Sequence, residues 1–276
     1  MIEEPRLAAV TGWPIAHSRS PLVHGHWLRR YGIRGYYVPI ALAPDAFAEG
    51  LLAMSKLGFR GTNVTIPHKE AALALATEVT AEARAIGAAN TITFGEDGTI
   101  HADNTDGYGF LANLRDAAPA WDAAAGPALV LGAGGASRAI VHALQDAGAP
   151  EVWIANRTAS RAEAVAGHFG ERVRVLDWET AAAAAADAAT IVNTTSLGMK
   201  PGEPMPVALD RLSAGALVTD VVYGAEPTAF VAAARERGLM AVDGLGMLLH
   251  QAVPGFERWF GVRPEVDADL RAAVLA

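Results

Sequence analysis

The chain has 276 residues, of which 51% are hydrophobic and 19% are charged, and its formal net charge at pH 7 is −8. Such a length and composition are those of a globular protein with room for two domains. The negative charge argues against a nucleic acid or an anionic membrane surface as a partner, although small anions remain suitable ligands. The absence of cysteine excludes disulfides, thiolate metal sites and a cysteine nucleophile, and it fits a reducing compartment.

The chain begins MIEEPR, an acidic segment without the basic start and apolar core of a signal peptide. No apolar run in the sequence reaches the length that crosses a membrane. We therefore expect a cytoplasmic protein with no membrane partner.

The first part of the chain alternates strand and helix patterns, as in a βα fold. Helices are expected at 21–31 and 44–57. Pro21 directly after Ser20 is typical of a helix with proline at its first position and serine as its N-cap. Strands are expected at 7–11, 36–40, 61–64 and 90–94.

Polar residues gather in two loops of this first part. Ser18 and Ser20 lie two residues apart, so both hydroxyls can point the same way and bind one carboxylate or polyol. The plainer alternative is that Ser20 only caps the helix, and periodicity alone favours the cap. Asn63 and Thr65 end the third predicted strand, and Lys69 follows at a helix start, where its charge opposes the helix dipole. Loops at the carboxyl ends of strands are where open α/β sheets bind ligands.

The second part begins with a strand, a glycine-rich turn and a helix. The apolar run 128–131 is followed by GAGGASR at 132–138 and by a helical run at 139–144. Glycines allow close backbone approach, and the N-terminus of the next helix favours phosphate, so this order indicates a dinucleotide pyrophosphate site. Ser137 stands where the fingerprint usually has glycine or alanine, and Ala136 and Ala139 are the alternative small residues for close packing.

The next predicted strand, 151–155, ends at Asn156, Arg157 and Thr158, without the carboxylate that binds the adenosine ribose of NAD. Arg157, and Arg161 one helical turn later, carry guanidinium groups whose forked donors suit the ribose phosphate of NADP. We therefore predict NADP rather than NAD as the cofactor.

The pattern predicts a substrate-binding domain over 1–106, a dinucleotide-binding domain over 107–243, and helices in 244–276 that pack back on the first domain, with a cleft between the domains. The alanine-rich stretch 181–186 predicts a helix without chemistry. We expect no metal, because His24 and His26 diverge on their predicted helix and have no third ligand at a recognisable spacing.

Taken together, these segments resemble the shikimate dehydrogenase family. The first part carries GxPIxHSxSP at 12–21, NVTxPxK at 63–69, GAxNT at 87–91 and NTDG at 104–107. The second part carries GAGGA at 132–136, NRT at 156–158, NTTSLGM at 193–199 and GMLLHQA at 246–252. Gly25 and Ala225 depart from the family pattern, which has asparagine and proline at these positions.

The resemblance implies a substrate-binding α/β domain, a Rossmann-type NADP-binding domain, and the reversible reduction of 3-dehydroshikimate to shikimate with NADPH. It makes Lys69 and Asp106 the catalytic pair. It places the substrate against Ser18, Ser20, Asn63, Thr65, Asn90, Tyr223 and Gln251. It implies NADP contacts at Gly132, Ala133, Gly134, Gly135, Ala136, Asn156, Arg157, Thr158, Arg161, Thr194, Val221 and Gly244, with Gly246 near the nicotinamide.

Two alternatives stay open. One is a relative that prefers quinate or an amino-substituted analogue, and the other is a non-catalytic sensor that binds NADP. Lys69 and Asp106 argue against the sensor, because a pure binder has no need of both. Ser18 and Ser20 favour shikimate, by resemblance alone. The sequence does not determine the oligomeric state, and a homodimer is one option.

Overall fold

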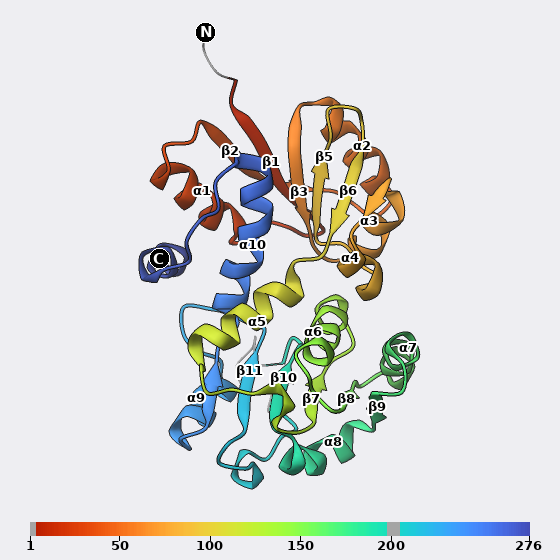
Figure 1. The fold of residues 1–276 in the computed structure, drawn as a ribbon, viewed down its shortest axis with the longest axis vertical. Helices are drawn as coiled ribbons and strands as arrows, with labels where there is room; N and C mark the ends of the chain where they lie inside the picture. The colour runs from red at the N-terminus through yellow and green to blue at the C-terminus, as the bar shows by residue number, and fades with distance from the viewer. Residues whose placement is uncertain (1–3, 198–204) are drawn as a thin grey trace. The chain divides into compact units, whose positions relative to one another are not determined.

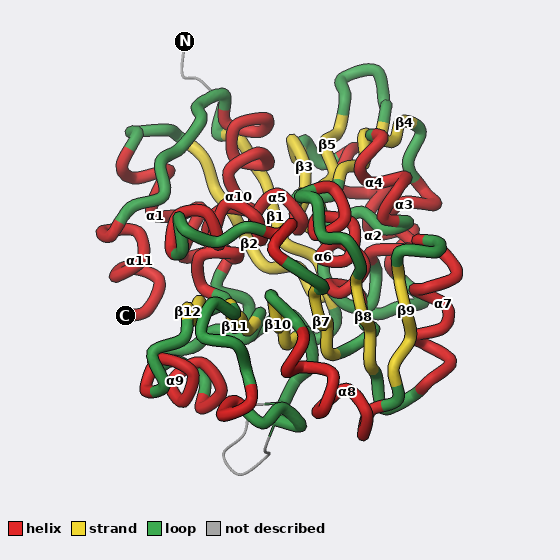
Figure 2. Tube along the Cα trace, turned by 60° about the horizontal axis from the view of Figure 1, so that its bottom comes forward, coloured by secondary structure: helices red, strands yellow, loops and turns green. Residues whose placement is uncertain are grey.

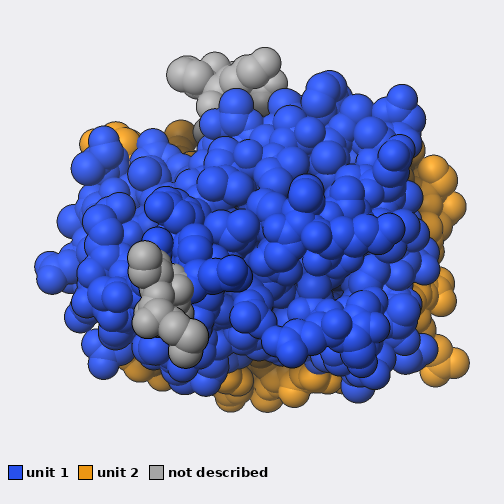
Figure 3. All heavy atoms as spheres, turned by 90° about the horizontal axis from the view of Figure 1, so that it is seen from above, with its two compact units in different colours: residues 1–109, 248–276 blue, residues 110–247 orange. Residues whose placement is uncertain are grey.

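A computed structural model describes residues 4–197 and 205–276 of the chain. The chain divides into two compact units, which Figure 3 distinguishes by colour. Unit 1 comprises residues 1–109 and 248–276, and unit 2 comprises residues 110–247. The predicted α/β fold class is confirmed, whereas the domain limits at 106 and 243 stay predictions.

Unit 1 contains a six-stranded mixed sheet in the order β2-β1-β3-β5-β6-β4, of which Figure 1 labels all strands except β4. β1 runs parallel to both β2 and β3, but β5 runs antiparallel to its neighbours β3 and β6. The strands are β1 (Arg6–Gly12), β2 (Gly35–Ala41), β3 (Phe59–Val64), β4 (Glu78–Val79), β5 (Thr91–Phe94) and β6 (Ile100–Asp103). The sequence pattern predicted neither β4 nor β6, because strands of two and four residues are too short to show a clear alternation.

Helices cover both faces of this sheet. α2 (Phe47–Lys56) and α3 (Lys69–Leu75) share a buried apolar cluster with β1, β3, β5 and β6. α1 (Ser20–Arg30) and α10 (Leu245–Phe260) contribute aromatic rings to the opposite face. There the Trp259 indole donates a hydrogen bond to the Ile92 carbonyl, 3.1 Å away. A side chain on Gly61 would lie 2.0 Å from the same indole nitrogen, so this strand position has room only for glycine. α4 (Ala81–Ile86) and α11 (Ala268–Leu275) complete unit 1.

The start of α1 differs from the prediction. The helix begins at Ser20, its N-cap is Arg19, and no side chain makes a capping hydrogen bond. The predicted Ser20 cap is therefore wrong, although Pro21 does lie in the first turn. Proline already fixes a helical backbone angle and has no N–H to satisfy, so the helix can start without a cap. Ser20 is buried, and because its hydroxyl does not cap the helix, that hydroxyl can make other contacts.

Unit 2 contains a six-stranded parallel sheet in the order β12-β11-β10-β7-β8-β9. Counted from the first strand of the unit, this order is 6-5-4-1-2-3, the order of a dinucleotide-binding Rossmann fold. The strands are β7 (Ala128–Leu131), β8 (Val152–Ala155), β9 (Val173–Leu176), β10 (Thr190–Asn193), β11 (Leu217–Asp220) and β12 (Met240–Val242).

Successive residues of β7 enter different cores. Ala128 and Val130 pack with α5 (Asp106–Ala117), α6 (Gly135–Asp146) and α7 (Ala159–Phe169), whereas Leu129 and Leu131 pack with α8 (Trp178–Ala184) and α9 (Ala229–Glu236). Burial of both faces explains the uninterrupted apolar run that marked this strand in the sequence.

The remaining helical turns are short. The predicted alanine-rich helix ends at Ala184 and continues as a 3-10 turn, Ala185–Asp187.

Figure 2 colours the helices red around the yellow strands of each unit. Within residues 4–197 and 205–276, no helix combines the length and the apolar character needed to cross a membrane.

Candidate active site

Lys69 and Asp106 form a close ion pair in unit 1. Lys69 Nζ lies 2.5 Å from Asp106 Oδ2, and the two side chains are only 13% and 9% exposed. Each is the first residue of its helix, α3 and α5. A carboxylate is favourable at a helix N-terminus, whereas an ammonium is not, so the pair offsets the unfavourable placement of Lys69. The sequence-predicted catalytic residues are thus brought together.

Asn90 holds the other oxygen of this carboxylate. Its Nδ2 donates to Asp106 Oδ1 over 2.8 Å and to Thr105 Oγ1 over 3.1 Å. Its Oδ1 accepts from the Thr105 backbone N–H over 2.8 Å. Gln251 on α10 lies beside this amide, with its Oε1 3.4 Å from Asn90 Nδ2. The backbone carbonyl of Gln251 accepts a hydrogen bond from Thr105 Oγ1 over 2.8 Å. Of the predicted substrate residues, Asn90 therefore contacts the ion pair directly, and Gln251 contacts Asn90.

The loop that carries Asp106 is fixed by its own side chains. Asn104 Oδ1 accepts from the Asp106 backbone N–H over 3.1 Å, and Asn104 Nδ2 donates to the Ala88 carbonyl over 2.9 Å. Asp103 Oδ1 accepts from the Asn104 N–H over 2.8 Å, and its Oδ2 lies 2.5 Å from Arg258 Nη2. These bonds hold the start of α5 in one position. Only the NTDG motif pointed to this loop in the sequence.

The antiparallel course of β5 explains why residues far apart in the sequence meet here. Asn63, at the carboxyl end of β3, pairs in register with Thr91, at the amino end of β5. Thr91 in turn pairs with Asp103, at the carboxyl end of β6. In a fully parallel sheet the amino end of β5 would lie at the opposite edge. The reversal places residue 90 beside both the β3 loop and the β6 loop.

Asn63 is buried among polar partners. Tyr37 donates its hydroxyl proton to Asn63 Oδ1 over 2.6 Å, and Asn63 Nδ2 donates to the Asn90 carbonyl and to Thr91 Oγ1, each over 3.2 Å. Burial raises the pKa of the Tyr37 hydroxyl well above 10, and a hydrogen bond with Ser20 offsets part of this shift. Sequence reasoning missed Tyr37, because it lies in a strand outside all of the family motifs.

The loops after β1 and β3 lie against each other. The Thr65 N–H donates to the Thr11 carbonyl over 2.9 Å, and the Trp13 N–H donates to the Ile66 carbonyl over 3.0 Å. A side chain on Gly12 would lie 2.5 Å from Thr65 Cγ2, so only glycine permits this approach. Ser18, half-buried in the first loop, accepts a hydrogen bond from the Ser20 N–H over 3.3 Å. Ser18, Ser20, Asn63 and Thr65 all belong to unit 1.

The glycine-rich turn lies between β7 and α6, at the point where the strand order of the unit 2 sheet reverses. Gly132 has a φ of +106°, and a side chain there would lie 2.5 Å from Thr194 Oγ1. Gly134 is the N-cap of α6 and makes no side-chain capping bond, so the N–H groups of Gly135 and Ala136 have no partner from a cap. The Ser137 hydroxyl donates to the Gly134 carbonyl over 2.6 Å, which resolves how serine fits at the third fingerprint position.

The remaining predicted cofactor residues lie at the carboxyl ends of the neighbouring strands. Asn156, after β8, accepts a hydrogen bond from the Ala133 N–H over 3.2 Å and donates to the Thr158 carbonyl over 2.9 Å. Arg157 and Arg161 are exposed, and within the described residues their guanidinium groups make no hydrogen bond or ion pair. Thr194 follows β10 and Val221 follows β11.

Two further glycines of unit 2, Gly244 and Gly246, lie close to atoms of other residues of the same unit. A side chain on Gly244 would lie 2.4 Å from the Val221 carbonyl oxygen. A side chain on Gly246 would lie 1.8 Å from Asn113 Oδ1, and Asn113 Nδ2 donates to the Asp243 carbonyl over 2.7 Å. Both positions require glycine for packing. Tyr223 also belongs to unit 2, whereas the other predicted substrate residues belong to unit 1. The last two residues of the motif at 193–199 lie outside the described residues.

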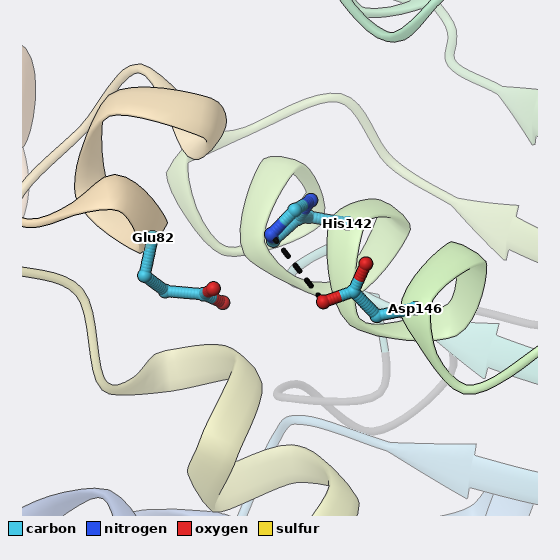
Figure 4. A group of neighbouring side chains, drawn as sticks. All are labelled: Glu82, His142 and Asp146. Carbon is cyan, nitrogen blue, oxygen red and sulfur yellow. Dashed lines mark ion pairs between the residues drawn. The ribbon is translucent and has the colours of Figure 1, made fainter.

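A histidine and an aspartate form an ion pair on the surface of α6. His142 Nε2 lies 3.8 Å from Asp146 Oδ2, one helical turn away (Figure 4). Glu82, also drawn there, belongs to unit 1. Two side chains are fewer than the four ligands of a structural zinc site. The expected absence of a metal stays a prediction.

Three family models match the chain. They are the shikimate dehydrogenase substrate binding domain at residues 10–92, shikimate/quinate 5-dehydrogenase at residues 118–199, and the shikimate 5'-dehydrogenase C-terminal domain at residues 244–274. The chain is 59% identical over 270 residues to shikimate dehydrogenase (NADP(+)) of Paracoccus denitrificans, covering 98% of this chain and 96% of that relative.

Solved structures agree with this assignment. The chain is similar to shikimate 5-dehydrogenase of Thermus thermophilus in complex with NADP(H) and shikimate, with 38% identity, a TM-score of 0.86 and 98% of both chains covered. It is also similar to quinate dehydrogenase of Corynebacterium glutamicum in complex with NAD, with 30% identity, a TM-score of 0.90 and 99% of both chains covered. The family expected from the motifs is confirmed: the chain belongs to the shikimate dehydrogenase family.

Proposed function

We propose that this chain is an NADP-dependent shikimate dehydrogenase, which interconverts shikimate and 3-dehydroshikimate. The observation that carries the proposal is the buried pair of Lys69 and Asp106, with Nζ and Oδ2 2.5 Å apart. A dehydrogenase must move a proton at the oxygen whose carbon gains or loses a hydride, and an ammonium beside a carboxylate suits that step. The family membership and the 59% identity to a shikimate dehydrogenase (NADP(+)) support the same activity.

Lys69 carries the proton in both directions. In reduction, its ammonium stabilises the negative charge that develops on the ketone oxygen and donates a proton to it. Oxidation is the reverse step: Lys69, as the neutral amine after loss of a proton to solvent, takes the proton of the substrate hydroxyl, and the Asp106 carboxylate stabilises the ammonium that forms. The nicotinamide, when bound, supplies or accepts the hydride. Asn90, bonded to Asp106 Oδ1 over 2.8 Å, keeps the carboxylate aimed at Lys69.

The residues of unit 2 fit a dinucleotide. A pyrophosphate needs close backbone approach and unpaired N–H groups at a helix N-terminus. Gly134 leaves open space where a side chain would stand, and α6 starts there without a side-chain cap. Gly132, Ala133, Gly135 and Ala136 complete the turn that would hold the phosphates, and Thr194, Val221 and Gly244 would line the carboxyl ends of the adjacent strands.

The preference for NADP is assigned to the loop after β8. Arg157 and Arg161 are exposed, and their guanidinium groups are not engaged within the described chain. Both are therefore available to a ribose phosphate, which a guanidinium recognises through paired hydrogen bonds. Asn156 and Thr158 would contact the same ribose.

The substrate is assigned to the polar loops of unit 1. Hydroxyl and amide side chains suit a polyhydroxylated ring acid, because each can donate or accept a hydrogen bond. Tyr223 of unit 2 is proposed as a further substrate contact. The residues of unit 1 are Ser18, Ser20, Asn63, Thr65, Asn90 and Gln251.

The proposal is tested by initial rates of oxidation of shikimate and of quinate, each with NADP and with NAD, followed by the formation of reduced nicotinamide. We expect the highest kcat/KM for shikimate with NADP. A clear preference for quinate would assign the chain to the alternative substrate, which the structural similarity to a quinate dehydrogenase keeps open. Binding of NADP without turnover of either acid would support the sensor.

A cytoplasmic location and a homodimeric state remain part of the proposal. The absence of cysteine fits a reducing compartment. Light scattering of the purified protein across a range of concentrations would give the oligomeric state, and a constant monomer mass would exclude the homodimer.

A further inference from the structure

Tyr37 is buried in unit 1 although it belongs to no family motif. It lies in β2, at the edge of the sheet, and the residue is 7% exposed. Its hydroxyl donates to Asn63 Oδ1 over 2.6 Å. Because burial keeps the pKa of this hydroxyl well above 10, the proton stays on Tyr37 and the direction of the bond is fixed.

The other contacts of Asn63 show which end of its amide is the NH2 group. One end of the amide lies 3.2 Å from the Asn90 carbonyl oxygen and 3.2 Å from Thr91 Oγ1. A carbonyl oxygen can only accept, so this end must be the NH2 group. The oxygen end therefore faces Tyr37, which is the end to which a phenol proton can be donated.

After these bonds are made, the Asn63 amide can still accept a hydrogen bond but cannot donate one. Both amide protons are engaged, by the Asn90 carbonyl and Thr91. The amide oxygen has two acceptor positions, and Tyr37 occupies one of them. Asn63 can then accept a hydrogen bond from a substrate hydroxyl, but it has no proton to give to a carboxylate or a ketone.

The ring of Tyr37 is held by aromatic neighbours. His24 stacks on it with ring centroids 3.8 Å apart and the planes only 2° from parallel. Trp259 of α10 packs at 6.2 Å from the same ring. Neither His24 ring nitrogen has a hydrogen-bond partner among the described residues, so the imidazole contributes packing rather than a polar contact. Stacking on this side keeps the Tyr37 hydroxyl directed at Asn63.

We infer that Tyr37 is a positioning residue, which fixes the Asn63 amide as an acceptor for a substrate hydroxyl. The inference rests on the proposed function, because Asn63 is a substrate contact only there. Loss of the hydroxyl leaves the oxygen end of the amide without its hydrogen bond, so that only the two bonds of the NH2 end hold the amide, and the contact that Asn63 offers to the substrate weakens.

The test compares Tyr37→Phe with Tyr36→Phe in the full-length protein. Both variants lose one phenol hydroxyl from β2, but Tyr36 is 60% exposed. We expect Tyr37→Phe to lower kcat/KM for shikimate about tenfold, through a higher KM for shikimate, with the KM for NADP unchanged. Tyr36→Phe should behave as the wild type. Equal changes in the constants for shikimate and NADP, or no change in either, would overturn the inference.

A double-mutant cycle with Asn63→Ala shows whether Tyr37 acts through Asn63. If it does, Tyr37→Phe should cause less than a twofold further loss in the Asn63→Ala background. Losses that multiply would mean an independent role and would reject the inference. If Asn63→Ala does not fold, the comparison of Tyr37→Phe with Tyr36→Phe decides alone. Absence of shikimate turnover by the wild type would instead reject the proposed function.

Discussion

The Nζ of Lys69 and the Oδ2 of Asp106 lie 2.5 Å apart, although the two residues begin different helices. Both side chains are largely buried, and Asn90 donates a hydrogen bond to the other carboxylate oxygen, Asp106 Oδ1. In the proposed mechanism this ammonium gives its proton to the substrate oxygen. The pair therefore makes the clearest prediction about turnover.

Replacement of Lys69 by alanine should lower kcat by about 10²-fold to 10⁴-fold, the range for loss of a general acid-base group. Binding of NADPH, measured by fluorescence titration, should be nearly unchanged. Lys56→Ala is the matched control, because Lys56 is an exposed lysine at the end of α2. Wild-type turnover by Lys69→Ala would remove Lys69 from the mechanism.

Two glycines of the same turn should respond differently to alanine. Gly132→Ala should destabilise the fold by about 1–3 kcal/mol, because of its positive φ and its close contact with Thr194. Gly134→Ala should leave the stability within about 0.5 kcal/mol, since its backbone angles suit alanine and the space is open. Its methyl group should nevertheless raise the Kd for NADP about tenfold or more, by keeping the pyrophosphate away from the helix. Thermal melts and NADPH titrations measure the two effects separately.

Arg157→Ala should weaken NADP binding about tenfold to a hundredfold, which is the loss expected for a charged hydrogen bond. The affinity for NAD should stay the same, because NAD has no ribose phosphate. Arg174→Ala removes an exposed arginine from β9 and serves as the control for net charge. An equal loss of affinity for NAD and for NADP would show that Arg157 does not bind the ribose phosphate of NADP.

His24 should make the folded state sensitive to acid. Burial lowers its pKa from 6.5 to about 3. Between these values the unfolded chain binds a proton that the folded chain does not, so stability falls as the pH falls, by up to about 1.4 kcal/mol per pH unit. The contribution is fully present above the unfolded pKa. Urea unfolding from pH 7 to pH 4 should show this slope in the wild type and a shallower slope in His24→Phe.

The control for His24 is His17→Ala, which removes a histidine that is exposed in the folded state. Its unfolding free energy should follow the pH dependence of the wild type. If His24→Phe and the wild type had parallel curves, the acid sensitivity would belong to other groups.

Much of unit 2 could be predicted from the sequence, because its signals are local. The apolar run of β7 and the glycines at 132–135 specify a strand, a turn and a helix within a short segment. The parallel order of the other strands follows the same βα repeat. The fit of Ser137 could not be predicted, since it depends on where the Gly134 carbonyl lies.

Unit 1 was harder to predict, because its sheet depends on pairing between distant segments. β6 reads Ile-His-Ala-Asp, an alternation of only four residues, which is too short to indicate a strand without its partner β5. The reversal of β5 is likewise invisible in a strand of four residues. The role of Tyr37 could not be predicted either, because it depends on contact with Asn63, which lies on another strand.

The discontinuous composition of unit 1 has a consequence for how the protein is made. Trp259 fills the space above Gly61 and bonds the Ile92 carbonyl, yet it leaves the ribosome almost two hundred residues after Gly61. Unit 2 is one continuous stretch and can fold as soon as it has emerged. Until α10 emerges, the nascent first segment exposes an apolar face without its cover. Synthesis therefore completes unit 2 first and delays the completion of unit 1 to the end of translation.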